Sequence, residues 1–313
     1  MMRRPRLIAG VSLVAAVVFA VMAAPAHGYV RKMTDAGIAE YWQVSCIPLT
    51  IYTYGFSDMT RDEVAKSIGA AAHTWSPSAV TCPDGTSHPF LEIVTSVADA
   101  GAKPPLPAYD GHNTVLFYSD AFPPPPESPF ALTSGIVALT SVFARADGHI
   151  VDADVQVNAI PPMRWANRDP GYVAGNGQSD DAYDLQNATT HELGHMQGLG
   201  HTCWNAFSDL EQPINDMGMG VPMCDTTTDP SIADTVMFAT ISSPTELTKR
   251  TLSADDIRAV CEIYPSTSDP GSCGAETPND GCGCSASGPP GPVLVLVLAL
   301  VAVVVLARVR ARR

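Results

Sequence analysis

Four segments of the chain have the apolar pattern of β-strands. Residues 47–54 and 150–157 alternate between apolar and polar positions, while residues 115–118 and 136–144 are more continuous runs rich in β-branched and aromatic side chains. Asp147-Gly148 stands between segments 136–144 and 150–157 and is typical of a tight turn. The pattern therefore predicts several strands before residue 160, two of them joined by a tight turn.

Three other segments have the spacing of helices. Residues 60–63 (Thr-Arg-Asp-Glu) match a capping box, and apolar side chains recur every three or four positions through 61–75. A second capping box at 253–256 begins a helix expected over 254–264, and a further helix is expected over about 184–198. Because strands precede two of these helices, the order of elements favours an α+β or α/β sandwich.

The first 28 residues have the pattern of a secretory signal peptide. Three arginines precede an apolar run at 7–24, and the small residues Ala24 and Ala26 provide a cleavage site. We therefore expect a signal peptide over 1–28 and export across the inner membrane. The alternative is an N-terminal helical anchor that is not cleaved.

The other end of the chain has a second apolar run. Residues 266–291 form a Gly-, Pro- and Ser-rich linker that ends with Cys282 and Cys284, and residues 292–307 form an apolar segment expected to cross the membrane. Four arginines lie in the tail, 308–313. This arrangement resembles the C-terminal sorting tags of myxobacterial surface proteins. The resemblance implies a processing enzyme that cuts near the cysteines, with the body anchored at the cell surface or released; a plain single-pass anchor is the alternative.

Charge excludes one large class of function. The part of the chain between the two arginine-bearing ends contains 11 Lys and Arg and all 32 Asp and Glu, so its net charge is −21. Phosphate recognition needs a cationic surface, so general nucleic-acid binding is excluded.

Six cysteines lie outside the Cys282/Cys284 pair, and an even number in an exported domain indicates disulfides. Fifteen pairings of six cysteines exist. Short loop closure alone favours Cys46–Cys82, Cys203–Cys224 and Cys261–Cys273. A zinc–cysteine site is less consistent with the sequence, because this part of the chain has no CxxC pair.

The strongest chemical signal is the segment HELGHMQGLGH. On a helix, His191 and His195 face the same side and can bind one metal ion, and Glu192 projects beside that ion, where it can take a proton from a bound water. Gly198 allows the helix to end in a left-handed turn that returns the chain and delivers His201 as a third ligand. Three nitrogen ligands leave a fourth zinc position open, as in catalytic sites. A helix with surface histidines, or a metal site without catalysis, would be the alternatives.

This motif is that of the metzincin metallopeptidases, and its surroundings resemble the matrixin branch. Asp-Thr-Val-Met-Phe, with Met237, resembles the family's Met-turn, and residues 252–264 resemble its last helix. The similarity spans residues 29–265. It implies an α+β zincin domain with a mixed twisted sheet, an active-site helix and a C-terminal helix, one catalytic Zn²⁺, and Met237 beneath the zinc ligands.

The sequence also departs from that family. Ala239 stands where matrixins usually have a proline, which affects the expected shape of the S1′ pocket. His149 with Asp152 and Asp154 could bind a second cation, although a solvated turn is the simpler interpretation. The Gly- and Asp-rich segment 169–184 could hold Ca²⁺, or form an ordinary surface loop.

Together these features predict an exported, cell-surface zinc endopeptidase with Glu192 as general base. The expected substrate is a peptide or protein that pairs in β fashion with the strand near 136–145. Two alternatives remain open: a surface adhesion module that retains a silent zinc site, and a zinc hydrolase acting on a non-peptide amide.

Overall fold

The computed structural model describes residues 28–121, 135–168, 180–205 and 211–271 of the 313-residue chain. The described helices are α1 (Arg61–Thr74), α2 (Leu185–Met196), α3 (Pro230–Ala233), α4 (Ala254–Ile263) and the short 3₁₀ turns η1 (Thr248–Arg250) and η2 (Ser266–Ser268). The strands are β1 (Val30–Arg31), β2 (Cys46–Ile51), β3 (Glu92–Val97), β4 (Thr114–Tyr118), β5 (Ala138–Ala144), β6 (Ile150–Asn158), β7 (Trp165–Ala166), β8 (Tyr183–Asp184) and β9 (Leu199–Gly200). This mixed α/β arrangement with few helices is compatible with the α+β prediction.

A five-stranded mixed sheet forms the centre of the fold. Its order is β3-β2-β4-β6-β5, and every neighbouring pair is parallel except β5 with β6. The tight turn expected at Asp147-Gly148 joins β5 to β6, and Gly148 has a positive φ of 89°. All four predicted strands are present. β3 is an additional strand at the sheet edge with one buried side chain, Ile93.

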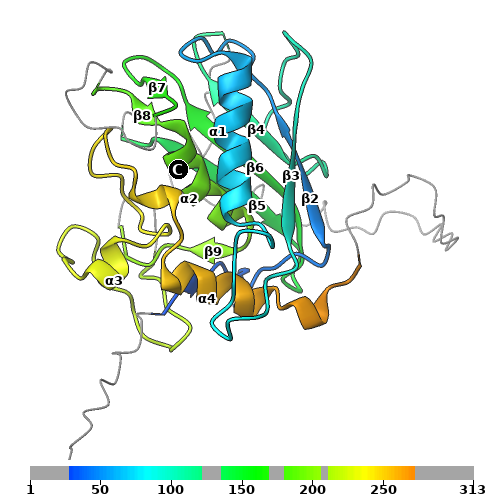
Figure 1. Cartoon of the computed structure of the whole chain (residues 1–313), viewed down its shortest axis with the longest axis vertical. Helices are drawn as coiled ribbons and strands as arrows, with labels where there is room; N and C mark the ends of the chain where they lie inside the picture. The colour runs from blue at the N-terminus through cyan, green and yellow to red at the C-terminus, as the bar shows by residue number, and fades with distance from the viewer. Residues whose placement is uncertain (1–27, 122–134, 169–179, 206–210, 272–313) are drawn as a thin grey trace, which may run out of the picture. The chain divides into compact units, whose positions relative to one another are not determined.

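Helices α1 and α2 lie side by side in front of the sheet (Figure 1). Both expected capping boxes are formed, at Thr60 for α1 and at Ser253 for α4. The indole Nε1 of Trp75, at the end of α1, donates to the carbonyl of Thr190 on α2 at 2.8 Å. The core between these layers is closely packed and includes Ile47, Leu49, Ile51, Val64, Ile68, Val155 and Leu193.

The disulfides correct two of the three expected pairings. Cys203–Cys224 is present as predicted, but Cys82 pairs with Cys261 on α4, across 179 residues. Cys46 is also disulfide-bonded. Because Cys82 and Cys261 bond to each other, neither Cys46–Cys82 nor Cys261–Cys273 forms. The reason is tertiary: the segment after α1 returns to α4, where the Phe90 amide donates to the Tyr264 carbonyl and the two rings meet edge to face.

Asp152 and Asp154 do not form a cation site with His149. The Asp152 carboxylate accepts hydrogen bonds from the amides of Asp110 and Gly111, and Asp154 accepts from Thr114 and Ala108. His149 instead contacts the hydroxyl of Tyr41. The two buried carboxylates therefore anchor the loop before β4 and the start of that strand.

Several predictions fall on residues that the structure does not describe. The signal segment up to residue 27, the membrane segment 292–307, the arginine tail 308–313 and the linker from residue 272 lie outside the described ranges. Cys273, Cys282, Cys284 and most of the candidate calcium segment, 169–179, also lie outside them. Among the described residues, no helix is long and apolar enough to span a bilayer.

Candidate metal centre

Helix α2 begins at a buried carboxylate. Asp184 is the N-cap, and its side chain accepts from the amide of Asn187 at 2.7 Å. The same carboxylate pairs with the guanidinium of Arg250 through two hydrogen bonds of 2.8 and 2.6 Å. This charged, bidentate contact connects the start of α2 to η1 and fixes where the helix enters the core.

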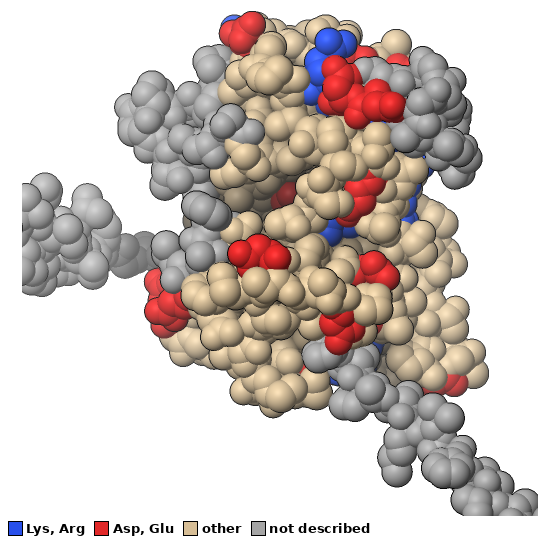
Figure 2. Space-filling model, turned by 90° about the vertical axis from the view of Figure 1, so that its left-hand side faces the viewer, with Lys and Arg blue, Asp and Glu red and all other residues tan. Residues whose placement is uncertain are grey.

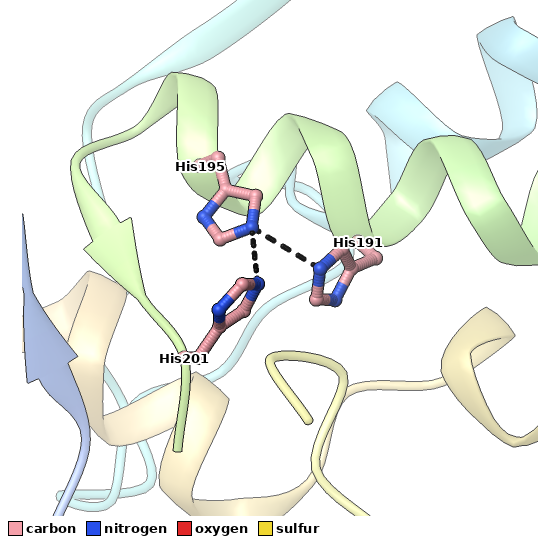
Figure 3. Close-up of side chains that lie close together, drawn as sticks. All are labelled: His191, His195 and His201. Atoms are coloured by element: carbon pink, nitrogen blue, oxygen red, sulfur yellow. Dashed lines mark hydrogen bonds between the residues drawn. The ribbon is translucent and has the colours of Figure 1, made fainter. Parts of the chain in front are cut away.

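Three histidine nitrogens converge on one point. Nε2 of His195 lies 3.1 Å from Nε2 of His191 and 3.0 Å from Nε2 of His201 (Figure 3). Tetrahedral zinc bonds of 2.0–2.1 Å would set such nitrogens about 3.4 Å apart, so the spacing is close to that of a metal site. Within the described parts of the chain, this is the one group of three or more His, Cys, Asp or Glu residues that could hold a metal ion.

The protonation of the rings agrees with metal binding. Nδ1 of His191 lies 2.6 Å from the carbonyl of Val236, and Nδ1 of His195 lies 2.8 Å from that of Leu199. A carbonyl only accepts, so each Nδ1 must carry the proton, and in the neutral ring Nε2 then presents a lone pair. Burial keeps the pKa of both histidines well below the usual value, which favours the neutral form. Facing lone pairs repel each other, and a cation among them removes that repulsion.

The third ligand is delivered by the expected turn. Gly198 has a φ of +84°, and a Cβ there would lie 2.6 Å from the carbonyl oxygen of Glu40, so both the conformation and the space require glycine. The chain then runs through β9, which pairs with β1, to His201.

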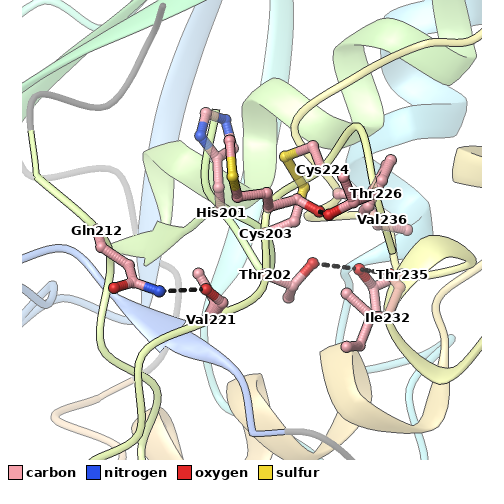
Figure 4. Close-up of a disulfide and its surroundings, with 12 residues drawn as sticks. His201, Thr202, Cys203, Gln212, Val221, Cys224, Thr226, Ile232, Thr235 and Val236 are labelled. Atoms are coloured by element: carbon pink, nitrogen blue, oxygen red, sulfur yellow. Dashed lines mark hydrogen bonds between the residues drawn. A yellow bond between two sulfur atoms is a disulfide. The ribbon is translucent and has the colours of Figure 1, made fainter. Parts of the chain in front are cut away.

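Three contacts hold the chain directly after His201, and Figure 4 shows the first two of them. The hydroxyl of Thr202 lies 2.7 Å from that of Thr235, and Cys203 is joined to Cys224. The amide of Thr202 also donates to the carbonyl of Met237 at 3.0 Å. The third ligand is therefore tied to the segment that carries Met237.

Met237 lies against the metal-binding helix. A Cβ on Gly194 would collide with the sulfur of Met237, so the close approach of this side chain to α2 depends on the glycine. The neighbouring residue Val236 supplies the carbonyl that orients His191. The turn that contains Met237 therefore supports two of the three histidine positions.

Glu192 is held by the edge strand. The hydroxyl of Thr140 on β5 donates to the Glu192 carboxylate at 2.7 Å and lies 3.1 Å from the Glu192 carbonyl. Burial raises the pKa of Glu192 to about 7, and the Thr140 hydrogen bond opposes that rise. The side chain can thus hold or release a proton near neutral pH.

A cavity of about 320 Å³ opens beside the histidines. Its wall combines the first residues of β5, the segment 238–241 after Met237, and Ala188 on α2. Lys249 of η1 also borders it. Ala239, where a proline was expected from the family resemblance, lies in this wall.

Sequence reasoning named Glu192, the three histidines and Met237, and the structure brings all five together. It did not find Thr140 or Lys249. Both act through contacts with residues more than ten positions away, Glu192 and Phe238. A polar residue at an inward position of an apolar strand was the available signal for Thr140.

No protein-family model matches the sequence, and no curated protein is significantly similar to it.

Proposed function

We propose that the protein is a zinc-dependent endopeptidase of the metzincin type, exported to the cell surface. The observation that carries the proposal is the convergence of three histidine Nε2 atoms beside a buried glutamate that lines the same cavity.

The residues fit zinc in particular. Three imidazoles form a donor set that zinc accepts, and each of the two helical ligands has its other nitrogen bonded to a backbone carbonyl. When bound, zinc would polarise the scissile carbonyl and lower the pKa of a water at the open position.

Glu192 would carry the proton in this reaction. It accepts a proton from the attacking water and later gives it to the leaving amine, a role that suits a carboxyl whose pKa is raised to about 7. Thr140 holds the carboxylate on the side of β5, so that it needs no rearrangement before reaction.

The substrate would be an extended polypeptide. β5 ends the order of the main sheet, and its first residues border the cavity. An extended segment can add to such an edge through backbone hydrogen bonds. Its scissile bond would then lie across the histidines.

Export and surface location rest on the ends of the chain and on the disulfides. Disulfides are typical of proteins in an oxidising compartment. The described residues contain the disulfides Cys82–Cys261 and Cys203–Cys224, and Cys46 is also disulfide-bonded. The membrane segment and a processing enzyme acting near Cys282 belong to the same proposal.

The test uses the full chain loaded with zinc and incubated with a diverse peptide library, with cleavage read by mass spectrometry. Glu192→Gln is the matched control, because it retains shape and removes the base. Cleavage by the parent, lost in a variant that still binds one zinc, supports the proposal. A folded, zinc-bound parent that cleaves nothing overturns it and favours a binding module or a non-peptide amide substrate.

A further inference from the structure

Lys249 is buried beside the proposed active site. It lies in η1, the residue is only 1% exposed, and it lines the same cavity as His191 and Glu192. Lysine is rarely so deeply buried, because its charge loses the stabilisation that water provides. A position of this kind needs a specific reason.

The contacts of Lys249 satisfy only part of its bonding capacity. Nζ donates to the carbonyl of Phe238 at 2.6 Å and lies 3.3 Å from that of Val236. An ammonium has three donors, and among the described residues no carboxylate lies within ion-pair distance of it. Two neutral carbonyls and the Phe238 ring, whose centroid lies 5.5 Å from Nζ, therefore orient the ammonium without neutralising it.

The rest of the cavity makes this cation distinctive. The wall is mainly apolar, and Lys249 is the one Lys or Arg among the described residues that line it. The residues that define the apolar wall include Ile136, Val137, Leu139, Ala188, Phe238 and Ile241. In such surroundings a charge interacts strongly with an opposite charge that enters.

We infer that Lys249 makes this cavity a receptor for a carboxylate side chain, so that the preferred substrates carry Asp or Glu at the residue that enters it beside the scissile bond. This inference rests on the proposed peptidase function and narrows its substrate class. A lysine that only stabilised the two carbonyls would give no such preference.

The charge of the protein surface distinguishes a preference that arises in the cavity from one caused by long-range attraction. Acidic side chains are scattered over the face shown in Figure 2, and the chain carries a net charge of −14. Long-range attraction between the protein and acidic substrates therefore cannot produce the inferred preference for Asp or Glu. The preference should arise inside the cavity and should persist when salt screens the surface charges.

The experiment compares peptides that differ only by Glu or Gln, and by Asp or Asn, at each position flanking the cleaved bond. At one position the wild-type chain should cleave the acidic member about tenfold faster in kcat/KM, the order expected of a charge-assisted hydrogen bond. Lys249→Met should reduce that ratio to near one, and Lys249→Arg should retain it. Lys66→Met, on the exposed side of α1, is the control and should leave the ratio unaltered.

Equal cleavage of acidic and amide peptides by the wild type overturns the inference, whatever the variants do. So does a preference that survives in a folded Lys249→Met protein. If the wild type cleaves no peptide, the peptidase proposal fails instead, and the cavity is tested by binding. Calorimetry with peptide hydroxamates bearing Glu or Gln then decides: tighter binding of the Glu compound supports the inference, and equal affinities overturn it.

Discussion

The carboxylate of Glu192 is oriented by a hydroxyl on another element. Thr140 is buried on β5, 52 residues earlier in the chain, and its Oγ1 donates to the Glu192 carboxylate. Burial alone would favour the protonated carboxyl, while this hydrogen bond favours the ionised form and fixes its orientation. Thr140 is thus a positioning residue for the proposed base.

Replacing that hydroxyl gives the first prediction at this scale. Thr140→Val keeps the shape of the side chain and removes the donor, so kcat should fall about tenfold with little change in KM, because the lost contact acts on the base and not on the substrate. Thr140→Ser should retain most of the rate. Steady-state kinetics on a cleaved peptide checks this, and equal losses in both variants would contradict it.

Lys249 gives a second prediction, for pH and stability. Burial lowers its pKa to about 8, whereas a lysine in the unfolded chain has its ordinary value near 10.5. Between these values the unfolded chain binds more protons, so the free energy of unfolding should rise with pH across this window, relative to Lys249→Met. The shift corresponds to a difference on the order of 3 kcal/mol.

Urea denaturation of the metal-free wild type and Lys249→Met, at pH values below and above that window, measures the difference. Parallel pH dependence of the two proteins would mean that the native lysine titrates normally.

At the scale of elements, the caps differ widely in importance. Thr60 caps α1 at the surface, whereas Asp184 caps α2 inside the protein and also pairs with Arg250. Removing an exposed cap costs about 1 kcal/mol. Removing one partner of a buried ion pair costs about 3–5 kcal/mol, because the other charge is left uncompensated.

Asp184→Ala should therefore destabilise the protein several times more than Thr60→Ala. The larger effect should also reach the metal site, since α2 carries His191 and His195. Chemical denaturation gives the first quantity and competition with a zinc chelator gives the second. Similar losses of stability in the two variants would show that the Asp184–Arg250 contact contributes little.

For the molecule as a whole, the disulfides define how distant segments are held together. Cys82–Cys261 joins the segment after α1 to α4 and closes 179 residues, while Cys203–Cys224 closes 21 residues beside His201. If cross-links act mainly on the unfolded chain, the long closure is worth about 5 kcal/mol and the short one about 3 kcal/mol.

Replacing both cysteines of each pair by alanine tests this difference. The Cys82/Cys261 variant should lose more unfolding free energy, and the Cys203/Cys224 variant should lose more zinc affinity, because its disulfide holds the chain after the third ligand. Denaturation curves and zinc titrations of both variants measure these effects. The opposite ranking in zinc affinity would be evidence that the Thr202–Thr235 contact alone holds His201.

The sequence by itself determined the features that depend on nearby residues. The capping boxes at Thr60 and Ser253, the apolar periods of the strands, and the helical spacing that places His191 and His195 one turn apart on α2 are all local. Each depends on hydrogen bonds or side-chain spacing within about one turn, so the residue types alone predict it. Proximity in the chain predicted Cys203–Cys224 correctly, but the same criterion failed for Cys261 and Cys273, so it does not determine a pairing by itself.

Only the tertiary structure decided which distant residues meet. The pairing of Cys82 with Cys261, the addition of β3 to β2, the Thr140–Glu192 contact and the entry of Lys249 into the cavity wall all join parts of the chain far apart in sequence. Periodicity indicates which side of an element is buried but does not identify the element packed against it. The partner is selected by the packing of the whole core, where many weak contacts must be satisfied together.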